Sequence, residues 1–163
     1  MTDSNPGQTV EERLEKLGLS LPEAALVKLP FAWVRVRGSR AFVSGHGPLN
    51  PDGSMARPLG KVGAELSLQQ GYEAARLTGL AILGSLKREL GALDRVAAWL
   101  RVLGMVNSAP GFTKQPLVMN GFSELILELY GPERGSHARS AVGMAELPFG
   151  MPVEIEAEVE IAG

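Results

Sequence analysis

One stretch near the C-terminus constrains the fold more than any other. Residues 153–161 read Val-Glu-Ile-Glu-Ala-Glu-Val-Glu-Ile, an unbroken alternation of apolar and acidic side chains. Successive side chains of a β-strand point to opposite faces, so this period predicts a strand with one apolar and one acidic face. Rows of exposed charge are common, and we interpret Glu158 and Glu160 as solvent-facing. Glu154 and Glu156 remain candidates for a functional role.

Other segments supply the partners of this strand. Alternating patterns predict strands over 31–37 and 40–44, joined in a hairpin at Gly38-Ser39, and strands over 96–106 and 139–147. The 96–106 segment is apolar on both faces except at Arg101, which favours a central position in the sheet. We expect 139–147 and 153–161 to form a final pair. A capping box at Ser67 predicts a long helix ending at Gly91, and Pro116 opens a second helix that ends at Gly131.

The order of these elements predicts the fold class. We expect residues 1–24 to form a polar tail and a short helix capped by Thr9, and residues 25–163 to form a single domain. Strand, strand, helix, strand, helix, strand, strand predicts an α+β fold in which a mixed sheet carries two helices on one face. The period of two places Trp33 and Arg35, and likewise Trp99 and Arg101, on the opposite face. A monomer would leave this face partly bare, so we expect it to contact other subunits.

The composition excludes several classes of function. The formal net charge is −2, without the basic stripe typical of nucleic-acid binding. The chain has no cysteine and only two histidines, His46 and His137, which cannot form a zinc site alone. We therefore expect no metal, and no partner among nucleic acids. No apolar run is long enough to span a membrane, and the N-terminus lacks a signal sequence, which favours the cytoplasm.

Arg139 is the first candidate for a ligand contact. It follows a polar loop and precedes the small residues Ser140 and Ala141, which leave room beside it. A guanidinium matches a carboxylate through two parallel hydrogen bonds. The alternative is a structural ion pair with a glutamate of the same protein. The segment Ser44-Gly45-His46-Gly47-Pro48 lacks the spacing of a dinucleotide or phosphate loop, so Gly45 either allows a close ligand approach or ends a strand sharply.

Together these motifs resemble a known family. The residues Val43-Ser44-Gly45-His46-Gly47-Pro48, Asn120, Ala138-Arg139-Ser140-Ala141-Val142 and Val153-Glu154-Ile155-Glu156-Ala157 are similar to the RidA family, also known as YjgF or endoribonuclease L-PSP. The similarity runs from about Phe31 to Ile161 and is closest to the longer members with an N-terminal helix. It implies a chorismate-mutase-like fold and a homotrimer, in which three sheets form a barrel with ligand pockets at the subunit clefts.

The resemblance also implies a chemistry. Arg139 would hold the substrate carboxylate and Glu154 would activate water, while Phe31, Ser44, Gly45, Asn120, Ser140 and Ala141 would line the pocket. The implied reaction is hydrolytic deamination of enamine or imine intermediates to 2-oxo acids and ammonia, without a cofactor. This chain has Phe31 and Ala141 where deaminases of the family commonly have Tyr and Cys, which leaves the substrate open. An endoribonuclease acting on single-stranded RNA and a non-catalytic binder of small carboxylic acids are the alternatives.

Overall fold

The computed structural model describes residues 7–24 and 27–163. Residues 1–6 of the predicted tail, and residues 25–26 at the start of the predicted domain, lie outside this described part. The elements follow in the order α1 (Val10–Lys16), β1 (Val34–Arg37), β2 (Arg40–His46), α2 (Leu68–Leu90), η1 (Leu93–Arg95), β3 (Val96–Asn107), α3 (Gln115–Gly135), β4 (Ala138–Met144), η2 (Pro148–Gly150) and β5 (Val153–Ile161). The α+β class expected from the sequence is confirmed.

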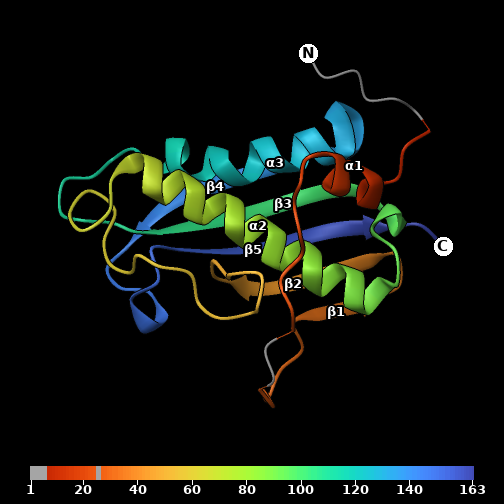
Figure 1. The fold of residues 1–163 in the computed structure, drawn as a ribbon, viewed down its shortest axis with the longest axis horizontal. Coiled ribbons are helices and arrows are strands. Elements are labelled where there is room, and N and C mark those ends of the chain that lie inside the picture. The colour runs from red at the N-terminus through yellow and green to blue at the C-terminus, as the bar shows by residue number, and fades with distance from the viewer. Residues whose placement is uncertain (1–6, 25–26) are drawn as a thin grey trace.

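The five strands form one mixed sheet in the order β1-β2-β5-β3-β4 (Figure 1). All neighbours are antiparallel except β3 and β4, which α3 joins as a parallel pair. The expectation that the last two strands pair is therefore wrong, because β3 lies between them. The loop through η2 carries the chain past the end of β3. The middle position belongs to β5, with β3 beside it, so the strand predicted to be central is off the centre by one.

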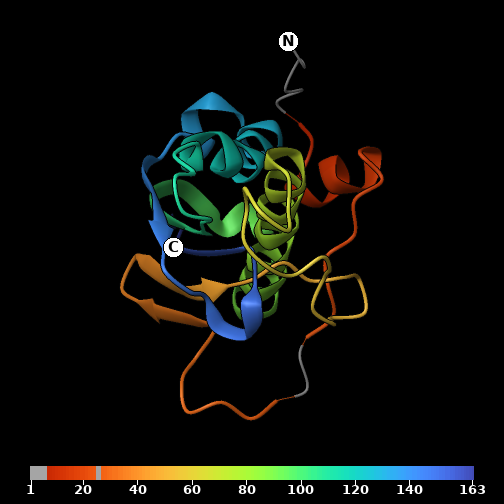
Figure 2. The same cartoon turned by 90° about the vertical axis from the view of Figure 1, so that its left-hand side faces the viewer.

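Helices α2 and α3 cover one face of the sheet (Figure 2). The capping box of α2 is present, since Ser67 Oγ accepts from Gln70 N and Gln70 accepts from Ser67 N. Helix α3 loses helical geometry at Gly131, where φ is 75°, and one more turn follows. The core between sheet and helices includes fully buried Phe122, Ile82 and Ile155. No described helix is both long and apolar enough to cross a membrane.

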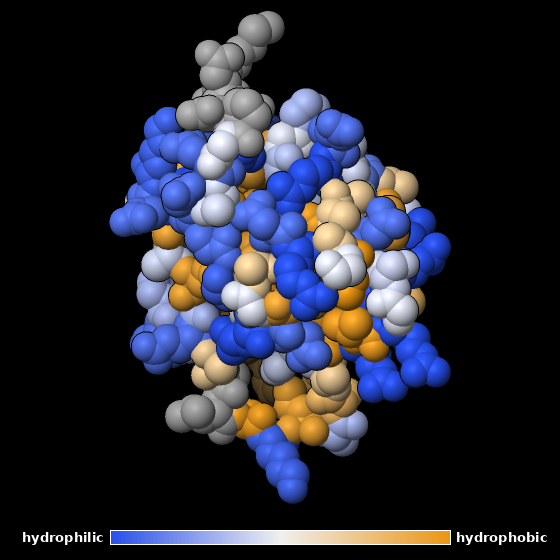
Figure 3. All heavy atoms as spheres, turned by 90° about the vertical axis from the view of Figure 1, so that its right-hand side faces the viewer, coloured by the Kyte–Doolittle hydropathy of each residue, from blue (hydrophilic) through white to orange (hydrophobic). Residues whose placement is uncertain are grey.

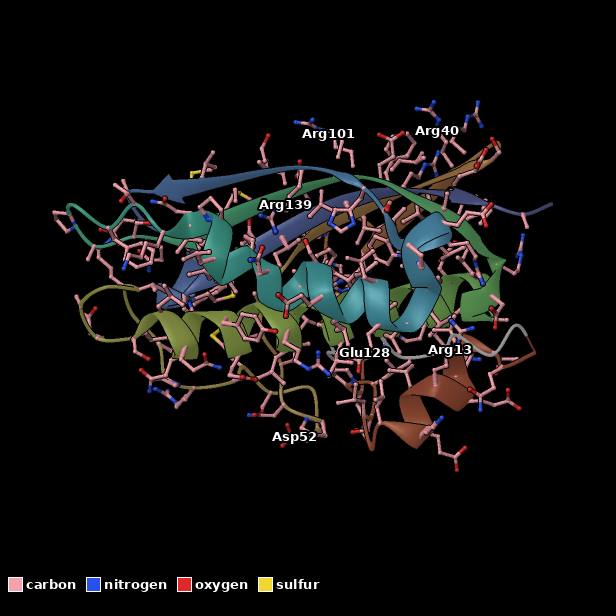
Figure 4. All side chains as sticks on the ribbon, turned by 90° about the horizontal axis from the view of Figure 1, so that it is seen from above. Arg13, Arg40, Asp52, Arg101, Glu128 and Arg139 are labelled. Carbon is pink, nitrogen blue, oxygen red and sulfur yellow. The ribbon has the colours of Figure 1, made fainter. Side chains whose placement is uncertain are left out.

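Helix α1 adds a third helix to the two that were expected on this side. It lies on the outer side of the helix layer (Figures 2 and 4). Val10 and Leu14 are buried in the common core. Polar contacts fix the helix as well: Lys87 Nζ lies 2.6 Å from Glu11 Oε1, and Arg13 Nη1 donates to the Leu129 carbonyl at 2.7 Å. α1 is thus packed against the domain along its length.

Trp99 occupies the opposite face from the one the sequence predicted. Its ring is buried under the helices, in edge-to-face contact with Phe122 and Tyr130. The register between β3 and β5 shifts between Trp99 and Arg101, so an irregularity adds a residue to β3 there. Such a bulge reverses the side to which the following residues point. Arg101 therefore faces away from the helices although Trp99 faces them.

We name the sheet face opposite the helices the open face. Arg40 and Arg101 project from it in Figure 4. The strand register places the glutamates of β5 on the same face. Phe42 is 44% exposed there and Val142 is 39% exposed. A hollow of about 250 Å³ lies between Phe42, Arg101, Leu103, Glu156 and Glu158. This face thus combines charged side chains with uncovered apolar ones.

Candidate functional site

Arg139 lies on the edge strand β4, and its side chain points toward α3 rather than toward the open face (Figure 4). Its Nη1 donates to Asn120 Oδ1 at 3.1 Å and to Ser123 Oγ at 3.0 Å, and its Nη2 donates to the Pro116 carbonyl at 3.3 Å. Asn120 and Ser123 are one turn apart on α3, so both side chains reach the same guanidinium. The structure thus joins two of the predicted residues, Arg139 and Asn120.

All three partners of Arg139 are neutral. None of the five ion pairs in the described part of the chain includes Arg139, so the alternative of an ion pair with a glutamate finds no support there. A guanidinium carries five N–H donors, and three are used. One donor on Nε and one on Nη2 remain. Burial lowers the pKa of Arg139, which reflects a partly desolvated charge.

A histidine completes this cluster. His137 Nε2 lies 2.9 Å from Ser123 Oγ, and His137 Nδ1 lies 2.7 Å from the Gly135 carbonyl. A carbonyl can only accept, so Nδ1 carries the proton and Nε2 accepts from the Ser123 hydroxyl. Burial lowers the pKa of His137, and the nearby charge of Arg139 also lowers it. The neutral ring therefore orients Ser123, whose lone pairs remain free to accept from Arg139.

A second group of predicted residues gathers at a bulge between β2 and β5. From Val43 to His46 strand β2 takes three steps, whereas its partner β5 takes two, from Ala157 to Ile155. The extra residue lies in the segment Ser44-Gly45. A Cβ built on Gly45 would lie 2.8 Å from Glu154 Oε2, so only glycine lets the Glu154 carboxyl rest there. Glycine at this position thus serves the close approach of a side chain.

Glu154 is partly buried and lies beside Glu156. Burial raises its pKa above the ordinary value, and the negative charge of Glu156 raises it further. Both causes disfavour the ionised form. A carboxyl with a raised pKa is a better proton acceptor at neutral pH than an ordinary one.

The segment before β1 lies against the bulge. Ser44 Oγ donates to the Ala32 carbonyl at 2.8 Å, and Ser44 N donates to the Trp33 carbonyl at 2.9 Å. The rings of Trp33 and His46 are 4.7 Å apart, and Phe31 contacts Trp33 edge-to-face. Phe31 is 53% exposed, so the aromatic residue expected in the pocket does reach the surface.

His46 anchors the other side of this bulge. Its Nδ1 lies 2.5 Å from the Ser44 carbonyl and its Nε2 lies 2.8 Å from Ser85 Oγ of α2. Burial lowers its pKa to about 4. The neutral ring therefore ties the bulge to the helix layer.

The remaining two predicted residues lie on opposite faces of β4. Ser140 pairs with Leu103 of the open face, whereas Ala141 pairs with Gly104 and packs against the core. Ala141 therefore shares its face with Arg139. Ser140 does not.

One chain does not bring Arg139 and Glu154 together. Arg139 aligns through Val102 with Ala157, three residues from Glu154 along β5. An odd separation places the two side chains on opposite faces, about 10 Å apart along the strand and about 10 Å apart across it. Ser44, Gly45 and Glu154 therefore form one half-site, and Arg139 with Asn120 forms another.

Sequence reasoning missed Ser123 and His137. Neither residue is among those that the sequence indicated for this site. The spacing of Asn120 and Ser123, three residues apart on a predicted helix, was the available signal. The described residues contain no group of three or more His, Asp or Glu that could hold a metal ion.

Comparisons with known proteins agree with this architecture. Residues 11–153 match the family described as YjgF/chorismate mutase-like, putative endoribonuclease. Protein TCP17 of Trypanosoma cruzi is 41% identical over 152 residues, which are 93% of this chain and 94% of that protein.

Two solved structures are similar over nearly their whole length. A protein of unknown function from Agrobacterium tumefaciens, Atu1372, is 38% identical with a TM-score of 0.84, covering 94% of this chain and 92% of that one. A structure described as a putative endoribonuclease from Shewanella oneidensis is 30% identical with a TM-score of 0.88, covering 94% and 100%. The match to the family model and the identity to these relatives show that the chain belongs to the YjgF/chorismate mutase-like family.

Proposed function

We propose that the protein hydrolyses 2-imino acids, or the enamines in equilibrium with them, to 2-oxo acids and ammonia. The observation that carries this proposal is the state of Arg139. Its guanidinium is held by three neutral groups, makes no ion pair within the described residues, and keeps one donor on Nε and one on Nη2. Such a charge is suited to the carboxylate of a small acid.

The proposed reaction needs little beyond orientation and a proton acceptor. Water adds to the carbon of the protonated imine while Glu154 accepts a water proton, which gives a neutral carbinolamine. Glu154 then returns this proton to the nitrogen, ammonia leaves, and the hydroxyl loses its proton to form the 2-oxo acid. The products are the 2-oxo acid and ammonia, so atoms balance without an oxidant. The raised pKa of Glu154 supports its role as the proton carrier. Arg139 contributes orientation by holding the carboxylate.

The two half-sites of one chain are separate, so we propose a homotrimer in which Arg139 of one subunit faces Glu154 of a neighbour. The open face, with its exposed Phe42 and Val142, supports an assembly of this kind. Phe31 lacks a hydroxyl and adds apolar surface at the bulge. We therefore expect apolar or bulky imino acids to be preferred over the one derived from serine.

Ammonia release from imines generated in place by an amino-acid oxidase tests the activity. Alanine, leucine and phenylalanine supply imines of increasing size. We expect accelerated decay with the wild type, and loss of most of kcat with Glu154→Gln while 2-oxo acids still bind. Equal decay with and without protein would contradict the deaminase, and retained 2-oxo-acid binding would then favour a non-catalytic binder.

A second candidate is an endoribonuclease. The description of the family and that of the Shewanella oneidensis structure both name this activity. On this chain the open face carries Arg35, Arg37, Arg40 and Arg101, but the four glutamates of β5 lie among them. Cleavage of single-stranded RNA by the same preparation, lost in Arg101→Ala but retained in Arg139→Ala, would favour this candidate.

A further inference from the structure

A second hollow lies between residues 31–34 and the C-terminal half of α2. Its volume is about 300 Å³, the lower end of the range for small-molecule sites. Phe31 and Trp33 line one side, and Ser85, Arg88 and Glu89 line the other. Hydrophobic residues gather at the lower end of the molecule in the view of Figure 3. The hollow has space for a molecule with one ring.

Arg88 brings an uncompensated charge to this hollow. Its Nη1 donates to the Pro22 carbonyl at 3.1 Å and its Nη2 donates to Ser85 Oγ at 3.2 Å. Both acceptors are neutral, and no ion pair of the described residues includes Arg88 or Glu89. Three of the five guanidinium donors are therefore unused. Burial lowers the pKa of Arg88, so its charge is partly removed from water.

The surroundings of Arg88 repeat those of Arg139. In each case the arginine donates to a helix serine, and that serine contacts Nε2 of a histidine. In each case Nδ1 of that histidine meets the carbonyl two residues earlier in the chain. Because the histidine accepts the serine proton, the serine oxygen accepts from the guanidinium. Arg88 is thus held in position in the same way as Arg139.

We propose that this hollow binds a small monocarboxylate with an apolar, ring-bearing body. The carboxylate would contact Arg88, and the ring would lie against Phe31 and Trp33, since aromatic pairs in edge contact are favourable. Glu89 lines the same hollow and opposes a second negative charge. This site does not involve Arg139 or Glu154, although it shares Phe31 with the pocket of the proposed imine hydrolysis.

The test uses hydrocinnamate as the probe and the full chain with Arg139→Ala, which removes the other arginine site. The indole N–H NMR signals of Trp33 and Trp99 report the position of binding, with Trp33→Phe used to assign them. We expect hydrocinnamate to shift the Trp33 signal and to leave the Trp99 signal, from the core, in place. Adding Arg88→Gln should weaken binding at least about tenfold, and Arg88→Lys less, because lysine keeps the charge without the fork.

The binding of a dianionic probe tests the role of Glu89. We expect phenylsuccinate to bind more weakly than hydrocinnamate, and Glu89→Gln to reduce that difference without weakening hydrocinnamate. Thermal melting of each variant confirms folding. Should Arg88→Gln fail to fold, Arg88→Lys and Glu89→Gln carry the same test. Absence of a Trp33 shift at millimolar probe, or affinity that is equal with Gln and Arg at position 88, overturns the proposal.

Discussion

The buried histidine at the bulge makes stability depend on pH. The pKa of His46 falls to about 4 in the fold, from 6.5 for an ordinary histidine, because burial disfavours the charged ring. As the pH falls, the unfolded chain therefore binds this proton first. The stability contributed by neutral His46 is fully present above pH 6.5 and is lost as the pH drops from 6.5 to about 4.

We expect this loss to reach at most about 3 kcal/mol of unfolding free energy. Urea unfolding of the wild type and of His46→Gln at several pH values between 7 and 4 measures it. His46→Gln should be less stable at neutral pH and should show a smaller decline on acidification. Because other groups titrate equally in both proteins, the difference between the two curves isolates His46. Parallel curves would show that His46 does not carry the pH dependence.

The cation of the proposed carboxylate site allows a second prediction at this scale. Arg139→Ala should weaken binding of small 2-oxo acids by about 1.5–3 kcal/mol, the usual value of a charge-assisted hydrogen bond. Arg139→Lys should be an imperfect substitute, because lysine lacks the planar fork. Calorimetric titration with pyruvate and a leucine-derived 2-oxo acid provides the measurement.

Folding must be separated from binding in this experiment. Arg139 is partly exposed and its partners are neutral, so we expect Arg139→Ala to keep the fold. Ser123→Ala is a matched control, because it removes one partner of the guanidinium and leaves the charge. If Arg139→Ala unfolds, Arg139 has a structural role. If the variant folds and binds 2-oxo acids with unchanged affinity, Arg139 does not contact the ligand.

At the scale of elements, two glycine substitutions near the bulge between β2 and β5 should affect turnover and stability differently. Gly45→Ala would place a Cβ 2.8 Å from Glu154 Oε2, at the end of a flexible side chain that can move away. We expect most of the turnover to be lost with little change in the melting temperature. Gly47→Ala is the matched control, because its Cβ would instead overlap the sulfur of the buried Met151 side chain. That variant should lose stability through local overpacking, by about 1–3 kcal/mol, without displacing Glu154 directly.

Turnover measured per folded protein compares the two glycine variants. The prediction requires the greater loss of kcat in Gly45→Ala and the greater loss of melting temperature in Gly47→Ala. The reverse pattern would show that the contact between Gly45 and Glu154 is not what positions the carboxyl.

Local signals in the sequence predicted the elements well, and long-range pairing was harder. The strand over 153–161 and the Ser67 cap of α2 are set by neighbouring residues, and both appear as expected. The strand order depends on which segments meet in space, so the position of β5 between β2 and β3 was not accessible. The prediction for Trp99 was wrong for a related reason. A bulge changes the alternation of side chains between the two faces of the strand, and the local sequence gives no clear signal of it.

The candidate site divides in the same way. The sequence predicted the residues that belong to short continuous family motifs, namely Arg139, Glu154, Ser44 and Gly45. Ser123, His137 and Arg88 were missed because their roles arise from contacts between α2 or α3 and residues distant in the chain. Residue type alone gives no indication of such contacts.

For the whole molecule, one face of the sheet is uncovered, and we expect other copies of the chain to cover it. The helices cover one face, while the open face exposes Phe42, Val142 and a hollow between Arg101 and Glu156. Uncovered apolar area among paired charges is typical of surfaces that bind another protein. We expect light scattering to give three times the chain mass of 17.3 kDa. Phe42→Glu should lower this mass, whereas Glu15→Gln, at an exposed position of α1, should not.

Mixed assemblies test whether each site takes residues from two subunits. Arg139→Ala and Glu154→Gln should each be inactive alone, because one lacks the carboxylate contact and the other the proton acceptor. If Arg139 of one subunit faces Glu154 of the next, a mixed trimer contains some interfaces where both residues are native. A trimer that contains both variants then has one native interface out of three, so it should show about a third of the wild-type activity.

The geometry of a single chain distinguishes a site shared by two subunits from a site within one subunit. Arg139 and Glu154 point to opposite faces of the sheet, so one subunit cannot complete the site without rearrangement. Co-expression of the two variants with different affinity tags, followed by purification on both tags, isolates the mixed species. The double variant Arg139→Ala, Glu154→Gln co-expressed with wild type is the control, because it keeps the proportion of substituted positions but places both on one chain. A mixed trimer as inactive as its parents would show that each site lies within one subunit, and the shared pocket would have to be abandoned.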